Sequence, residues 1–157
     1  MNKSLITVFI LLIMVCTAGA SDEKAVKLSP KDKCPVCGMF VAKYPDFLAL
    51  VRFKDGSYAA FDGVKDMMKC YLNMKKYLPG RNIRDIRDVK VTEYYGLRLV
   101  DGFKAHYVVG SNVFGPMGRE LIPLEAEKDA KEFMKDHQGR NILRFAEINE
   151  KILRELD

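Results

Sequence analysis

Residues 46–64 read DFLALVRFKDGSYAAFDGV, and this stretch predicts a β-hairpin that leads into a helix. The run from Asp46 to Phe53 is apolar and favours an extended strand. Asp55-Gly56 then marks a tight turn, and the apolar run resumes from Tyr58 to Phe61. Two such runs joined by an Asp-Gly turn are typical of paired antiparallel strands. The sequence therefore predicts two neighbouring strands here.

The residues after this hairpin predict a helix and a third strand. From Val64 to Leu78 the apolar residues take helical spacing, and Asp62 is placed to act as the N-cap. Pro79-Gly80 ends the helix, and residues 86–95 alternate imperfectly, as in another strand. The first half of the chain is thus expected to form a ββαβ unit.

The second half repeats the order strand, turn, strand, helix, strand, although few residues are identical between the halves. We therefore predict an α+β fold of two tandem ββαβ units with a C-terminal helix, in one domain over residues 34–157. The first unit is expected at 34–95 and the second at 104–157. The second-half segments are a half-buried strand at 105–109, a Gly/Pro-rich loop at 110–118, a short strand at 121–122, a helix at 126–137, a strand at 141–145 and a closing helix at 148–156.

Length and composition restrict the class of protein. The chain has 157 residues, of which 48% are apolar and 30% charged, and a net charge of +5, which is typical of one small globular domain. A solenoid, a polytopic membrane protein and a large multidomain enzyme are excluded. Arg81, Arg84 and Arg87 are interleaved with Asp85 and Asp88, so we read them as a solvated face and expect no nucleic-acid binding. The sequence shows no catalytic acid–base pair, nucleophile triad or phosphate loop, so we do not expect an enzyme.

The first twenty residues have the pattern of a secretory signal peptide. An apolar run at 5–15 precedes Ala18-Gly19-Ala20, which predicts cleavage after Ala20 and export to the periplasm. Residues 21–33 are polar and lysine-rich and predict a flexible leader. Lipidation of Cys16 would give membrane association, but a lipoprotein site needs a small residue where Val15 stands.

The sulfur-containing residues suggest a metal site. Cys34 and Cys37 form a Cys-x-x-Cys pair, and Met39 follows across a glycine, so one short loop offers up to three soft donors. Copper(I) is soft and accepts two to four thiolate and thioether ligands. Met117 lies in a Gly-Pro-Met-Gly segment outside the helical and strand patterns. It is either a fourth soft ligand or a loop methionine packed on the surface.

Other chemistries of the Cys-x-x-Cys pair remain open from the residues alone. Structural zinc would need Cys70, His106 or His137 to complete a four-ligand site. A thiol-disulfide oxidoreductase would need its first cysteine at a helix start, which residues 38–41 do not predict. A purely structural disulfide is a third interpretation. Four further methionines are expected to pack in the core, namely Met67, Met68, Met74 and Met134.

These motifs, taken in order, resemble the NosL family of exported copper(I)-binding accessory proteins of nitrous oxide reductase. The two specific motifs are the Cys-Pro-Val-Cys-Gly-Met run and the later Met-Gly-Arg-Glu-Leu-Ile-Pro run. The matching pieces cover most of the chain after Ala20: residues 34–39, Asp55-Gly56 with Phe61-Asp62, residues 105–111, residues 117–123 and residues 142–148.

The resemblance implies a fold of two ββαβ units and a metallochaperone function. Such a protein would take Cu(I) in the periplasm and pass it to nitrous oxide reductase, with a maturation or membrane transport complex as a further partner. Carried over by position, the implied metal ligands are Cys34, Cys37, Met39 and Met117. The chain departs from the family at Leu124, where an aromatic residue is common, and in the residue before Cys16. NosL-like proteins outside nitrous oxide reduction could bind soft metals more generally.

Overall fold

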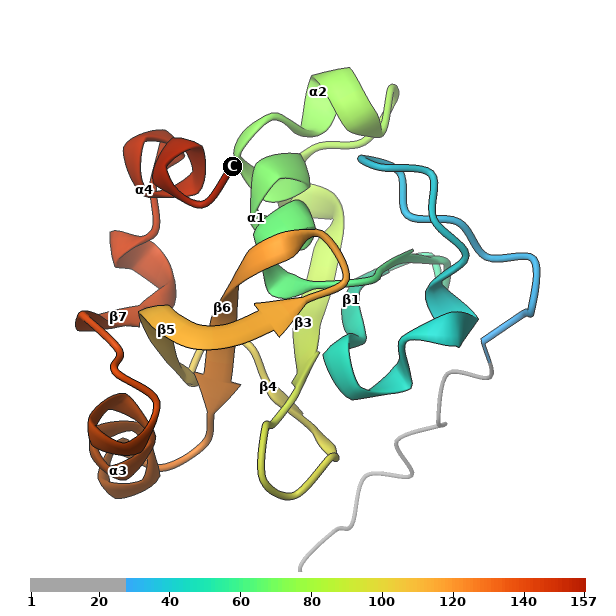
Figure 1. Ribbon diagram of the computed structural model, residues 1–157. Coiled ribbons are helices and arrows are strands. Elements are labelled where there is room, and N and C mark those ends of the chain that lie inside the picture. The colour runs from blue at the N-terminus through green and yellow to red at the C-terminus, as the bar shows by residue number, and fades with distance from the viewer. Residues whose placement is uncertain (1–27) are drawn as a thin grey trace, which may run out of the picture.

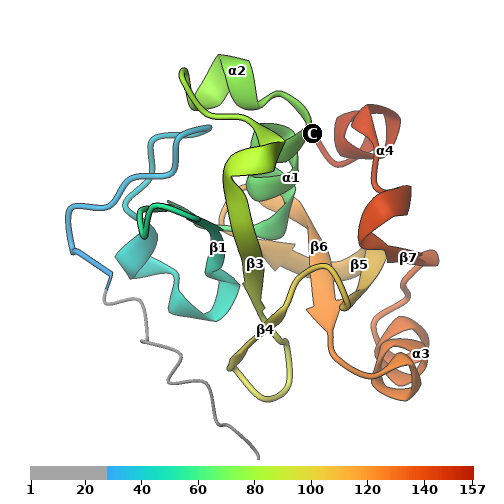
Figure 2. The same cartoon turned by 180° about the vertical axis from the view of Figure 1, so that it is seen from behind.

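The computed structural model describes residues 28–157. The predicted signal peptide, Cys16 and residues 21–27 of the predicted leader lie outside the described residues. Within residues 28–157, no helix is long and apolar enough to cross a membrane. The chain forms two antiparallel sheets, with helix α1 lying between them (Figures 1 and 2).

The first sheet has four strands in the order β2-β1-β3-β4. Strands β1 (Ala49–Phe53) and β2 (Tyr58–Phe61) form the predicted hairpin, with Ala49 opposite Phe61, and β1 also pairs with β3 (Ile86–Thr92). Strand β4 (Leu99–Asp101) adds to the free edge of β3 and was not predicted. It has only three residues, which is too short for a recognisable period.

The predicted long helix is divided in two. Helix α1 (Val64–Leu72) ends at Asn73, whose backbone is not helical, and the short helix α2 (Met74–Tyr77) follows. A 3-10 turn, η3 (Ile83–Asp85), then leads into β3. The first half therefore runs strand, strand, helix, strand, as predicted.

The second sheet has three strands in the order β6-β5-β7. Its elements are β5 (His106–Gly115), β6 (Gly118–Leu124), α3 (Glu127–Asp136) and β7 (Asn141–Arg144). The closing helix α4 (Glu150–Glu155) follows a 3-10 turn, η4 (Phe145–Glu147). The prediction of two ββαβ units with a C-terminal helix is confirmed.

The prediction of a loop at 110–118 is wrong for most of that range. Strand β5 continues to Gly115 and pairs there with Gly118, after a register shift between Val109 and Phe114. Only Pro116 and Met117 remain in the turn. Glycines in this segment suggested a loop, but here they allow a bulged and tightly turned hairpin, since both Gly110 and Gly118 have positive φ.

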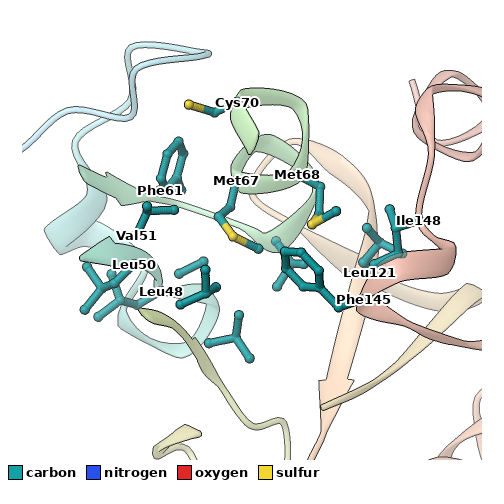
Figure 3. Packing of buried hydrophobic residues seen from close by; sticks show 14 of the residues in the cluster. Leu48, Leu50, Val51, Phe61, Met67, Met68, Cys70, Leu121, Phe145 and Ile148 are labelled. Carbon is teal, nitrogen blue, oxygen red and sulfur yellow. The ribbon is translucent and has the colours of Figure 1, made fainter. Parts of the chain in front are cut away.

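The main core surrounds α1. Met67 and Met68 point from α1 into this core, with Leu50, Val51 and Phe61 of the first sheet and with Leu121 and Phe145 of the second half (Figure 3). Helix α3 covers the other face of the second sheet, where Val108, Ile122 and Phe133 form a smaller cluster. The second sheet is therefore buried on both faces. The burial of Met67, Met68 and Met74 confirms their predicted core role.

Candidate metal centre

The Cys-x-x-Cys segment folds into a tight turn closed by its own backbone. The amide of Gly38 donates to the carbonyl of Cys34 at 2.9 Å, and the amide of Cys34 donates to the carbonyl of Met39 at 2.9 Å. Lys33 and Phe40 pair on either side of the turn. Gly38 has a φ of 80°, which is readily adopted only without a Cβ. The motif glycine is therefore needed to turn the chain back after Cys37.

This turn lies against the start of α1, where two aspartates meet the two thiols. The Cys34 thiol donates to Oδ2 of Asp66 at 3.4 Å, and the Cys37 thiol donates to Oδ1 of Asp62 at 3.1 Å. One ligand atom from each of these four residues lies within 4.8 Å of all the others. We call this group the Cys–Asp cluster. Cys34, Asp62 and Asp66 are buried and Cys37 is half-buried, so the cluster opens to solvent on the Cys37 side.

Asp62 has a different role from the predicted one. The N-cap of α1 is Gly63, and the Asp62 side chain does not cap the helix. Its Oδ2 atom is buried and has no hydrogen-bond partner among the described residues. Buried polar atoms are nearly always paired, so an unpaired carboxylate oxygen beside two thiols is a suitable place for a cation. The donor set of the Cys–Asp cluster thus fits a metal ion.

Burial keeps both thiols in the neutral form. Removal from water raises the pKa of Cys34 strongly and raises that of Cys37 to about 11. The adjacent Asp62 carboxylate adds to both shifts, because a thiolate would be repelled by it and would lose the hydrogen bond. A metal ion that binds here must therefore displace the thiol protons.

The second unit holds the start of α1 in place. The carboxylate of Glu120, on β6, accepts hydrogen bonds through Oε1 from the amides of Lys65 at 2.6 Å and Leu121 at 2.8 Å. A Cβ on Gly63 would lie 2.2 Å from Oε2 of Glu120, so a side chain at this position would displace the carboxylate from the helix start. Burial raises the pKa of Glu120 to about 7. Glu120 replaces Asp62 as the side chain that satisfies the helix start.

The predicted thioether ligands lie next to these elements. Met39 is half-buried, and its carbonyl is bonded to Cys34. Met117 is 45% exposed in the β5–β6 turn, and its carbonyl accepts a hydrogen bond at 2.8 Å from Nζ of the buried Lys65. Because Lys65 precedes Asp66, this bond ties the Met117 turn to the helix that carries Asp66. Participation of the two sulfurs in metal binding stays a prediction.

The remaining candidates lie elsewhere. Cys70 is buried within α1, and burial raises its pKa to about 12. The Nε2 atom of His106 is 2.6 Å from Nη1 of Arg144, and His137 stacks on Phe133 at 4.3 Å. Among residues 28–157, the Cys–Asp cluster is the one group of three or more His, Cys, Asp or Glu side chains close enough to share a metal. The zinc site that would use Cys70 or a histidine is therefore not assembled.

Asp66 was missed from the sequence. Asp62-x-x-x-Asp66 is a pair of acidic residues spaced closely around the predicted helix start, since Asp62 precedes the N-cap Gly63 and Asp66 is the third residue of α1. That spacing follows directly after a predicted strand and could have been recognised. The proximity of these aspartates to the cysteines could not have been recognised, since 25 residues separate Cys37 from Asp62.

The chain is similar to known proteins both in sequence and in fold. The profile of the NosL family matches residues 25–153. The "Copper-binding lipoprotein NosL" of Stutzerimonas stutzeri is 32% identical over 145 residues, an alignment covering 87% of this chain and 75% of that protein. The crystal structure of the copper chaperone NosL from Shewanella denitrificans superposes with a TM-score of 0.68 and 21% identity, covering 82% of this chain and 97% of that one. The fold is therefore shared with that protein, and the chain belongs to the NosL family.

Proposed function

We propose that this protein is a periplasmic copper(I) metallochaperone that delivers copper to nitrous oxide reductase or to its maturation and transport complex. The observation that carries the copper site is the convergence of the Cys34 and Cys37 sulfurs with two carboxylates, within 4.8 Å, at a partly open turn. The names of the two relatives, a copper-binding lipoprotein and a copper chaperone, support copper as the cargo. Export rests on the sequence of residues 1–20, and delivery to the reductase rests on the family resemblance.

The chemistry of the donors favours a soft monovalent ion. Thiolates are soft ligands and bind Cu(I) at low coordination number, whereas carboxylates prefer harder ions. We assign Cys34 and Cys37 as the metal-binding thiolates, with the thioethers of Met39 and Met117 completing the site. Asp62 and Asp66 then serve mainly as hydrogen-bond acceptors for the thiols, and each carboxylate can pass the proton that the metal displaces on to solvent. Their negative charge also attracts the incoming cation.

Delivery by ligand exchange requires an accessible metal. Cys37 is half-buried, so an entering ligand can reach the copper from the Cys37 side of the cluster, and the 45% exposed Met117 is also accessible to solvent. Each thiol regains a proton as copper leaves, and its high pKa favours that step. The same protonation opposes oxidation of the site, since the thiolate is the reactive form.

Anaerobic Cu(I) titration against a competing chelator tests the copper site. We expect one tightly bound Cu(I) per chain, and loss of competitive binding in a variant carrying both Cys34→Ser and Cys37→Ser. Met39→Leu and Met117→Leu, made separately, should weaken binding while they keep nearly the same volume. Cys70→Ser is the matched control, because Cys70 lies outside the Cys–Asp cluster. Unchanged affinity in the double cysteine variant would refute the assignment.

The affinity should also depend on pH. Both thiols are protonated throughout the neutral range, so binding releases up to two protons and the binding constant should rise up to about 100-fold per pH unit. Repeating the titration from pH 6 to pH 8 measures this slope. A flat profile would mean that the thiols do not bind the metal.

The alternative of a thiol-disulfide oxidoreductase has less support. That chemistry needs a cysteine whose pKa is lowered, whereas burial raises the pKa of both Cys34 and Cys37. The two cysteines are free thiols in the structure, as is Cys70. Turnover of a disulfide substrate by the metal-free protein, dependent on Cys34 and Cys37, would favour the enzyme.

A further inference from the structure

A groove lies beside the C-terminal end of α1, away from the helix start next to which the Cys–Asp cluster lies. Its volume is about 500 Å³. One wall comes from the end of α1 and from α2, and the other comes from residues 81–84, which include most of η3. Leu72 and Ile83 contribute apolar surface from opposite walls, and they are 37% and 52% exposed. The groove thus has solvent-accessible apolar side chains on both sides.

The charged residues of this groove are all basic. They are Lys75, Lys76, Arg81 and Arg84. Arg81 is neutralised by Asp55, at 2.7 Å, and its guanidinium lies over the Phe53 ring. Lys75 and Arg84 have no ion-pair partner among residues 28–157. Arg84 and Arg87, which the sequence predicts to lie on one solvated face, therefore have different surroundings. Arg87 pairs with Asp88 at 2.9 Å, whereas Arg84 lines the groove and has no ion-pair partner among the described residues.

We propose that this groove is a docking site for an acidic, partly apolar segment of a partner protein that exchanges copper with the Cys–Asp cluster. Carboxylates of the segment would pair with Lys75 and Arg84, and its apolar side chains would cover Leu72 and Ile83. A groove with two walls contacts a peptide on both sides, which a flat bilayer surface cannot do. A second copy of the chain fits less well, because two chains that each carry a net positive charge repel each other.

The position of the groove explains why such a segment would help copper exchange. Leu72 lies six residues after Asp66 on α1, which is about 9 Å along a helix that rises 1.5 Å per residue. A partner anchored in the groove holds its own copper ligands near the Cys–Asp cluster and raises their effective concentration. The copper step rests on the proposed function, whereas docking of the acidic segment does not.

The binding test uses a 12-residue peptide of alternating leucine and glutamate, and its glutamine counterpart, titrated into the full-length protein labelled with ¹⁵N. We expect the acidic peptide to shift the amides of residues 71–84, and the glutamine peptide to bind about tenfold more weakly. The double variant Lys75→Glu with Arg84→Glu should lose about tenfold in affinity. Charge reversal at Lys128 and Lys135, exposed on α3, changes net charge equally and should change affinity less than twofold.

Three results would overturn the docking proposal. The first is an equal loss of affinity in the α3 control, which would reveal attraction to net charge alone. The second is equal binding of the glutamine peptide. The third is a shift of residues 71–84 by phosphatidylglycerol vesicles but not by the acidic peptide, which would make the groove a membrane contact.

Copper transfer provides a second readout. The acceptor is the acidic peptide extended by Cys-Gly-Gly-Cys, added to copper-loaded protein under anaerobic reducing conditions. Copper–sulfur bonds to Cys34 and Cys37 break as bonds to the peptide sulfurs form, and the two protons from the peptide thiols return to Cys34 and Cys37. Transfer should be about tenfold faster than to a glutamine acceptor, and this advantage should vanish in the Lys75→Glu, Arg84→Glu variant.

Failures of the two proposals are distinguishable. The charge-reversed variant should bind Cu(I) like the parent, because Lys75 and Arg84 lie outside the Cys–Asp cluster. If the parent binds the peptide but not copper, docking stands and the proposed function fails. If it binds copper but transfers equally fast to both acceptors, the role of the groove in exchange is refuted.

Discussion

The two ββαβ units have the same order of elements but place their helices in different surroundings. Helix α1 is buried on most sides, between the first sheet, β6 and α4, and even its Lys65 and Asp66 are buried. Helix α3 lies on the outer face of the second sheet and buries only Ala130 and Phe133. Topology alone therefore does not make the metal centre, because only one unit has the Cys-x-x-Cys turn packed against its helix start.

The third residue of each helix illustrates the difference. Asp66 in α1 and Asp129 in α3 occupy the same position, where a negative charge suits the helix dipole. Asp66 is buried and accepts a hydrogen bond from the Cys34 thiol, whereas Asp129 belongs to no group of potential metal ligands within residues 28–157. In α3 the carboxylate of Asp129 only stabilises the helix. In α1 the equivalent carboxylate of Asp66 also belongs to the Cys–Asp cluster.

The largest expected contrast concerns core packing. Met67→Ala should lower the free energy of unfolding by about 3 kcal/mol, because it leaves a cavity beside fully buried side chains. Met134→Ala, on the half-buried side of α3, should cost about 1 kcal/mol. Chemical denaturation measures both. Cu(I) affinity should stay unchanged in Met67→Ala, and a loss of affinity would identify Met67 as a ligand and not as a core residue.

The next effect is the pH dependence caused by Glu120. Burial raises its pKa from 4.5 to about 7, so between these values the folded protein holds a proton that the unfolded chain has released. Its contribution to stability is therefore complete below pH 4.5 and is lost as pH rises through 7, by up to about 3 kcal/mol.

Denaturation of Glu120→Gln at pH 5 and pH 8 tests this contribution. The amide cannot ionise, so the loss of stability between these two pH values should be smaller than in the parent by about the same amount. Glu127→Gln, at the exposed start of α3, is the control: the ion pair with Lys131 lowers the pKa of Glu127, so it stays ionised between pH 5 and pH 8 and its replacement should reproduce the pH response of the parent. An unchanged pH response in Glu120→Gln would mean that Glu120 is ionised in the folded protein at both values.

The smallest expected effect concerns the two aspartates at matching helix positions, Asp66 in α1 and Asp129 in α3. Asp66→Asn should weaken Cu(I) binding about tenfold, since it removes a negative charge beside the metal-binding thiols, although the amide oxygen can still accept the hydrogen bond from the Cys34 thiol. Asp129→Asn should leave affinity unchanged. Competitive Cu(I) titration of both variants measures the contrast, and equal affinities would show that the carboxylate at α1 has no part in binding.

Local patterns accounted for most of the fold. The Asp-Gly turn, the change of period at Val64 and the alternation before Val109 depend on neighbouring residues, and the strands and helices that they predict are present. Strand β4 and the extended hairpin around Met117 were missed because their pairing partners, and not their own residues, make them strands. The prediction of Asp62 as N-cap was wrong for a similar reason, since Glu120 arrives from β6 and frees Asp62 for the Cys37 thiol.

By itself, the sequence determined the order of the secondary structure, the family and the Cys34–Cys37 pair, because each is written in residues close together along the chain. Only the tertiary structure decided that Asp62 and Asp66 stand beside those thiols, that Lys65 joins the Met117 turn to α1, and that a basic groove lies farther along the same helix. Each of these features brings together side chains from distant segments. They depend on how the elements pack around α1, and that packing cannot be predicted from the spacing of residues along the chain.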